Sequence, residues 1–146
     1  MIDVLDKLIV RSEEDHLVLL ELTAKYLDFS ASSNAEIVAH YNKKLNTVFE
    51  IHNLIPFVSP LKHLTDGISN YYLTQYEEAE KDLLKAEEEF KIGMPKDIWG
   101  AIKWAKGLTA RSIGKIDEAV KNLWEARDII NPKGYFLITY AYSLYQ

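Results

Sequence analysis

The stretch from Tyr76 to Ala86, Tyr-Glu-Glu-Ala-Glu-Lys-Asp-Leu-Leu-Lys-Ala, returns 40 residues later as Ile116 to Ala126, Ile-Asp-Glu-Ala-Val-Lys-Asn-Leu-Trp-Glu-Ala. Gly67 and Gly107 keep the same offset. A period of this size is typical of stacked helical hairpins, in which each unit buries its apolar face against its neighbours. The repeat therefore predicts an all-α protein of stacked antiparallel hairpins. It suggests a binding protein without indicating a reaction.

Apolar residues at helical spacing, interrupted by Gly, Pro, Ser and Asn, predict about seven helices and no strand. We expect Ser12, Asn34 and Ser59 to cap three of them at the N-terminus, and Gly93 to end one in a left-handed conformation. The predicted ranges are 2–10, 12–29, a helix from Asn34 to about His52, 59–73, 76–91, 97–113 and 116–130, with another beginning in 135–145.

With 146 residues and 48% apolar composition, the chain fits a single domain, residues 1–146. Within it, residues 1–56 form N-terminal helices and a divergent hairpin, and residues 59–146 form the repeats. The chain has no cysteine, which excludes disulfides and thiolate chemistry. No apolar run reaches the roughly 18 residues that span a bilayer, so we expect a cytoplasmic protein without a membrane partner. The net charge of −5 argues against direct nucleic-acid binding.

These features resemble tetratricopeptide repeats, a helix-turn-helix family with a 34-residue unit. Three small residues in each unit carry the resemblance: Gly67, Ala79 and Ala86, then Gly107, Ala119 and Ala126. The resemblance implies a right-handed solenoid whose third unit, beginning near Tyr135, is incomplete. The resemblance includes the small-residue positions over 59–146, whereas over 12–55 it is limited to the arrangement of two helices in a hairpin. The first unit is longer than the family unit, and the family's helix A tryptophan and leucine are out of place. An unrelated helical bundle is the alternative.

In that family, ligands lie against the concave surface of the first helix of each hairpin. The positions of the family's carboxylate clamp are here Leu64, Ile68 and Ala105, which cannot hold a carboxylate, so a chaperone-tail clamp is not expected. Aromatic and cationic side chains, which dominate the energy of desolvated binding sites, occupy other positions of the same groove. Ordinary core between repeats is the alternative for all of them. The candidate peptide-binding residues are Tyr71, Tyr72, Trp104, Leu108, Arg111, Tyr142 and Tyr145.

No residue set in the sequence predicts catalysis, a metal or a cofactor. The segment Gly107–Ile116 superficially resembles a phosphate loop, but its glycine spacing is too long and it lacks the magnesium-binding hydroxyl. No two histidines lie within one helical turn, as a zinc-binding pair requires. The acidic run 77–89 is read as a solvated helix face, with a docking surface for a basic partner as the alternative.

The sequence therefore favours a non-enzymatic module that binds a protein or peptide in an aromatic groove, with Arg111 orienting a carboxylate or carbonyl. A sensor or regulatory domain of a larger signalling or transcription-regulating protein is the alternative. The unfinished third unit motivates this alternative, because additional repeats or a second copy of the chain would cover the apolar face of the helix expected at 135–145. The ligand, the pathway, the oligomeric state and the completeness of the chain are not determined by the sequence.

Overall fold

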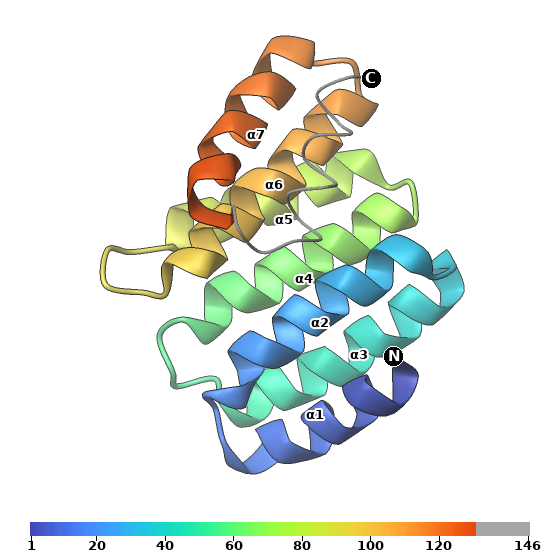
Figure 1. Ribbon diagram of the computed structural model, residues 1–146, viewed down its shortest axis with the longest axis vertical. Helices are drawn as coiled ribbons and strands as arrows, with labels where there is room; N and C mark the ends of the chain where they lie inside the picture. Colours follow the sequence, from blue (N-terminus) through green and yellow to red (C-terminus); the bar gives the residue numbers. More distant parts are fainter. Residues whose placement is uncertain (131–146) are drawn as a thin grey trace.

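A computed structural model describes residues 1–130, and this part of the chain is entirely helical, without a strand (Figure 1). The all-α prediction is confirmed, and the helix expected at 135–145 lies outside the described residues. The helices are α1 (Ile2–Glu14), α2 (Val18–Ser32), α3 (Ala35–Ile51), α4 (Val58–Tyr72), α5 (Tyr76–Glu89), α6 (Lys96–Ser112) and α7 (Ile116–Ile130).

Short turns fold the later helices into two hairpins, α4 with α5 and α6 with α7, and these hairpins lie side by side (Figure 1). Helix α6 packs against both α4 and α5, so the second hairpin covers the first. Helices α2 and α3 both contact α4, and α1 packs against α2 and α3 at the N-terminal end. Helices α2, α4 and α6 are thus successive neighbours.

The two segments that match in sequence also fold alike. Gly67 and Gly107 are buried in α4 and α6, each facing a leucine of its hairpin partner, and the four repeated alanines are at most 3% exposed. The turns after α4 and α6 use the same hydrogen bond: Gln75 N donates to Asn70 O at 2.8 Å, and Lys115 N to Ala110 O at 2.9 Å. The two hairpins that match at the 40-residue offset therefore share their close helix contact and their turn hydrogen bond.

The first hairpin differs because residues 1–66 contain no glycine. Where the later hairpins have a glycine between their two helices, α2 presents the buried Tyr26 to α3. Its hydroxyl donates to Val38 O at 3.4 Å. A side chain of that volume prevents the close approach that glycine permits, which explains why this hairpin matches the repeats only in architecture.

Of the three predicted N-caps, one is confirmed. The Asn34 side chain accepts a hydrogen bond from Ile37 N at 2.9 Å at the start of α3. Ser12 was wrongly expected to begin a helix: it is buried inside α1, and its hydroxyl donates to Ile9 O. Ser59 is also not a cap, because α4 already begins at Val58 and the Ser59 hydroxyl donates to Glu89.

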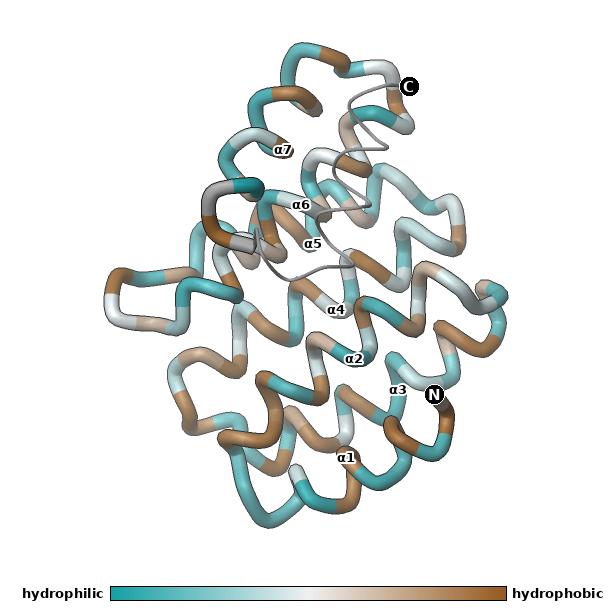
Figure 2. The backbone as a smooth tube through the Cα atoms, in the orientation of Figure 1, coloured by the Kyte–Doolittle hydropathy of each residue, from teal (hydrophilic) through white to brown (hydrophobic). Residues whose placement is uncertain are grey.

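All seven helices contribute to one hydrophobic cluster, which runs from Leu5 in α1 to Ala126 in α7. Apolar and polar residues alternate along the tube in Figure 2, as expected for helices that bury one face. Helix α6 is the exception, because its residues 100–105 are all buried and span more than a full turn. Within residues 1–130, no helix is both long and apolar enough to cross a membrane.

Candidate functional site: the outer parts of α4 and α6

Two of the predicted binding residues lie inside the protein. Trp104 and Leu108 of α6 are 0% and 4% exposed and belong to the hydrophobic cluster. Their helical spacing made them look like a groove surface, yet the packing of α6 on α4, α5 and α7 surrounds them. For these two residues the structure shows the alternative reading, core between repeats.

Tyr71 and Tyr72, at the C-terminal end of α4, remain partly exposed. Their rings pack edge to face with centroids 5.0 Å apart, and the ring of Tyr76 lies 5.8 Å from that of Tyr71. Both Tyr71 and Tyr72 also rest against the hydrophobic cluster, which limits their motion. Rigid, half-exposed tyrosines bind partners at a low cost in conformational entropy. We call Tyr71, Tyr72 and Tyr76 the tyrosine cluster.

Arg111 of α6 occupies the place that Tyr71 has in α4, one repeat later. Helices α4 and α6 are in contact. Arg111 is only partly exposed, and its Nη1 atom is buried without a hydrogen-bond partner among the described residues. Buried polar atoms are normally paired, and an unpaired charged donor is costly. The Nη1 group of Arg111 can therefore donate a hydrogen bond to an acceptor from outside the described residues.

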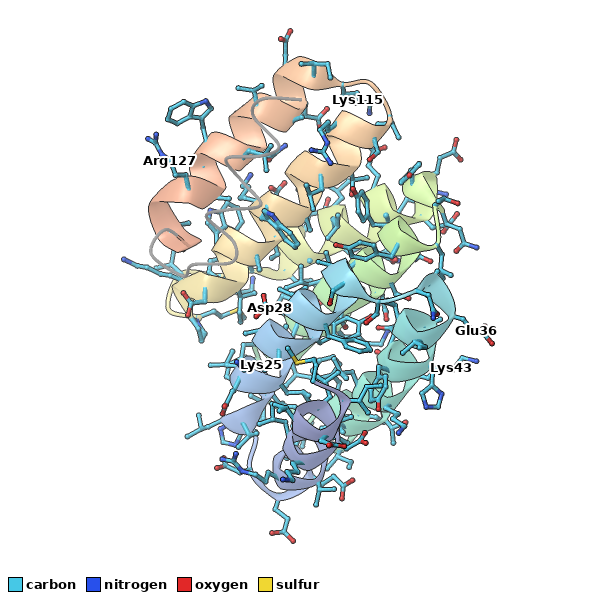
Figure 3. The ribbon with its side chains drawn as sticks, turned by 45° about the vertical axis from the view of Figure 1, so that its right-hand side comes forward. Lys25, Asp28, Glu36, Lys43, Lys115 and Arg127 are labelled. Atoms are coloured by element: carbon cyan, nitrogen blue, oxygen red, sulfur yellow. The ribbon has the colours of Figure 1, made fainter. Side chains whose placement is uncertain are left out.

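Asp28 is a second polar group without a partner. It lies on α2, one turn after Lys25 (Figure 3), and its Oδ1 atom is buried and accepts no hydrogen bond within residues 1–130. Burial raises the pKa of Asp28, while the nearby Lys25 charge acts in the opposite direction. Sequence analysis missed Asp28 because an aspartate on an amphipathic helix looks solvated, and only the packing reveals its burial.

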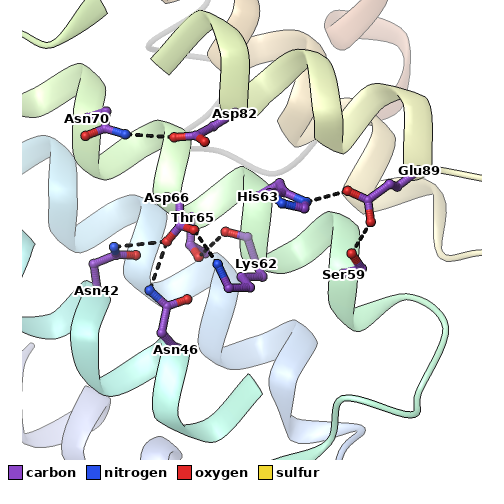
Figure 4. A network of polar contacts seen from close by, with 10 residues as sticks. All are labelled: Asn42, Asn46, Ser59, Lys62, His63, Thr65, Asp66, Asn70, Asp82 and Glu89. Atoms are coloured by element: carbon purple, nitrogen blue, oxygen red, sulfur yellow. Dashed lines mark hydrogen bonds and ion pairs between the residues drawn. The ribbon is translucent and has the colours of Figure 1, made fainter. Parts of the chain in front are cut away.

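Two other polar clusters connect helices through hydrogen bonds and ion pairs. Asp66 of α4 accepts from Asn42 and Asn46 of α3 at 3.1 and 2.9 Å and pairs with Lys62 at 2.8 Å (Figure 4). Asn70 donates to Asp82 of α5 at 2.7 Å, and burial raises the pKa of Asp82 despite this bond. The Oδ1 atoms of Asn42 and Asn46 remain buried without a hydrogen-bond partner among the described residues. Because the bonds of Asp66 and Asn70 link α3, α4 and α5, we assign these groups to the scaffold.

A cluster of charged residues connects the α4–α5 hairpin to the α6–α7 hairpin. Glu87 of α5 accepts from Lys103 and Lys106 of α6 at 2.6 and 2.9 Å, and Lys103 also reaches Glu125 of α7 at 3.1 Å. The Lys103 ammonium lies 4.6 Å from the centroid of the Trp99 ring. Lys106 stands one repeat after Asp66, and each of them bonds the second helix of the preceding hairpin.

Within 1–130, no group of three or more His, Cys, Asp or Glu side chains is placed to hold a metal ion. A shallow, widely open hollow of ≈ 540 Å³ on α3 is lined by Asn46, Thr47, Glu50 and Ile51, and it brings no reactive pair together.

Two of the predicted site residues, Tyr142 and Tyr145, lie outside the described residues, as does the helix expected at 135–145. The same is true of the incomplete third unit that motivated the sensor-domain alternative. The structure therefore adds no argument for that alternative.

Comparison with protein families and with curated proteins finds no match to this chain, and no solved structure matches it either. The resemblance to tetratricopeptide repeats consequently rests on the amino-acid sequence.

Proposed function

We propose that the protein is a non-enzymatic interaction module, built from tetratricopeptide-like hairpins, that binds a peptide segment of a partner protein. The binding surface consists of the tyrosine cluster and Arg111, with Asp28 as a second polar contact. The ligand supplies a carboxylate or carbonyl oxygen to Arg111.

The single observation that carries the proposal is the buried, unpaired Nη1 of Arg111. A guanidinium has five N–H donors and binds a carboxylate through two parallel hydrogen bonds. A protein that keeps such a donor without an internal acceptor incurs a stability cost that a ligand oxygen would remove. Arginine and tyrosine together are also the residues that most often dominate the energy of protein interfaces.

The test uses a panel of fluorescent short peptides that end in a free carboxylate or carry Asp and Glu, with matched amidated and Gln/Asn versions. Fluorescence anisotropy should show that the wild-type chain prefers the carboxylate peptides. Arg111→Gln should weaken that binding by about tenfold, equivalent to ~1.4 kcal/mol, and should reduce the preference for carboxylates.

Arg11→Gln is the matched control, because it removes the same charge from an exposed arginine of α1. It should leave both affinity and preference unchanged. An Arg111→Gln variant that binds the panel as wild type does would contradict the proposal, and so would equal losses in the two variants.

A further inference from the structure

The outer face of α7 carries a stripe of apolar side chains. Ile116, Val120 and Trp124 stand four residues apart, on one side of the helix, and are 57%, 39% and 44% exposed. Helix α7 is the outermost described helix at its end of the stack, and Figure 3 shows Arg127 on this outer side. The Arg127 guanidinium lies over the Trp124 ring, 3.8 Å from its centroid. We call these four residues the α7 stripe.

The matching face of α5 is chemically different. One repeat earlier, Tyr76 packs against Tyr71, and Glu80 forms an ion pair with Lys115 at 2.9 Å. Val120 thus stands where α5 has a paired glutamate. β-Branched residues are not preferred on a solvated helix face, since they lose side-chain freedom there without burial in return. The apolar character of the α7 stripe is therefore not a requirement of the repeat.

The order of residues along α7 is self-complementary when a second α7 runs in the opposite direction. An antiparallel pairing centred midway between Val120 and Trp124 places Val120 against Trp124 of the second copy, and Asp117 against Arg127 of the second copy. Asp117 is exposed beside the stripe. A parallel pairing would instead place Asp117 against Asp117 and Arg127 against Arg127, which is repulsive.

We propose that the α7 stripe is the contact surface of a twofold dimer, in which α7 packs antiparallel against α7 of a second copy of this chain. Burial of the apolar stripe drives the association, and the two symmetry-related Asp117–Arg127 pairs select the antiparallel orientation. Such a twofold contact is closed, so the assembly stops at two chains. One helix face is a small interface, below about 1,200 Å², and the dimer is therefore weak and concentration-dependent.

Sedimentation equilibrium from low micromolar to several hundred micromolar protein tests the association. The wild-type chain should pass from monomer to dimer over this range. Val120→Glu introduces the residue that α5 carries at the matching position, so the helix tolerates it, and it should leave the protein monomeric throughout. Val10→Glu is the matched control: Val10 is an exposed valine of α1, at 64% exposure, and its replacement should not change the association.

Cysteine cross-linking tests the orientation, since the natural chain contains no cysteine. Under mild oxidation, a mixture of Val120→Cys and Trp124→Cys chains should give mainly the mixed disulfide dimer. Either variant alone should give much less.

Three outcomes would overturn the proposal. One is a wild-type chain that stays monomeric at every concentration, which leaves the stripe to another segment of the chain or to a different partner. Another is equal dissociation by the Val120 and Val10 substitutions. The last is efficient disulfide cross-linking between two Val120→Cys chains when this variant is oxidised alone.

Discussion

A Cβ atom on Gly67 would lie 2.8 Å from both Cγ and Cδ2 of Leu83, closer than van der Waals contact allows. The same relation recurs one repeat later, where a Cβ on Gly107 would lie 2.6 Å from Cγ of Leu123. In each hairpin, a leucine of the second helix thus occupies the space that a side chain would need on the first.

We therefore expect Gly67→Ala to lower the free energy of unfolding by about 1–3 kcal/mol, as overpacking of a tight core does. Urea denaturation measures this. The same substitution is then made in a Leu83→Ala protein, which lacks the obstructing Cγ and Cδ2 atoms. In that protein, Gly67→Ala should lower the free energy of unfolding only slightly. Equal costs in the two backgrounds would show that the leucine contact is not the cause.

Thr74 has a positive φ of 61°, and its counterpart one repeat later is Gly114, with φ 83°. The left-handed region destabilises a residue with a side chain by about 1–2 kcal/mol. Glycine avoids this cost, but it loses more conformational entropy on folding, which offsets part of the gain. We expect Thr74→Gly to stabilise the protein by roughly 0.5–1 kcal/mol. Thr47→Gly, in the exposed middle of α3, should destabilise it, which urea melts of both variants would reveal.

Glu87 joins the two repeats through Lys103 and Lys106. Burial alone would raise the pKa of Glu87, but the hydrogen bonds and charges of the two lysines outweigh it and hold the pKa below its ordinary 4.5. We expect Glu87→Gln to destabilise the protein by about 2 kcal/mol, less than the roughly 3–5 kcal/mol of a fully buried pair, because Glu125 still contacts Lys103.

The pH dependence of this effect has a defined sign. A carboxylate with a lowered folded-state pKa contributes stability above its unfolded pKa and loses it as the pH falls through the folded pKa. The stability difference between wild type and Glu87→Gln should accordingly be complete at neutral pH and shrink below pH 4.5. Glu88→Gln, at the exposed neighbouring position, should match wild type at every pH.

Asp28 should show the opposite behaviour, because burial raises its pKa. The native state then binds the proton more tightly than the unfolded chain does, and the contribution of Asp28 to stability falls as the pH rises above 3.8. We expect Asp28→Asn to stabilise the protein slightly at neutral pH and to weaken peptide binding. Thermal melts at several pH values, with Glu21→Gln on the same helix as control, would test the first effect. A destabilised Asp28→Asn protein would contradict it.

Much of the fold was predictable because helix formation and hairpin closure depend on short-range pattern. The positions of Gly67, Ala79 and Ala86, and their recurrence, were sufficient to place the two hairpins. Helix starts were harder: Asn34 caps α3, whereas Ser12 and Ser59 found partners elsewhere in the fold. A capping side chain competes with every acceptor that tertiary packing brings close, and the sequence does not contain that information.

The candidate site was predicted only in part. The repeat register predicted Tyr71, Arg111 and Trp104 as parts of one groove, and of these Trp104 is buried. Spacing assigns a side chain to a face of a helix; it does not show whether another helix covers that face.

The amino-acid sequence by itself determined the period of the chain, the number of repeats that could be matched and the small residues between the helices, because these follow from helical geometry and side-chain volume. Tertiary structure alone decided which polar atoms lost water without gaining a partner. A helical wheel cannot distinguish Arg111 and Asp28 from other polar residues, because only the packing of several helices removes solvent from Nη1 and Oδ1, as it does from the Oδ1 atoms of Asn42 and Asn46.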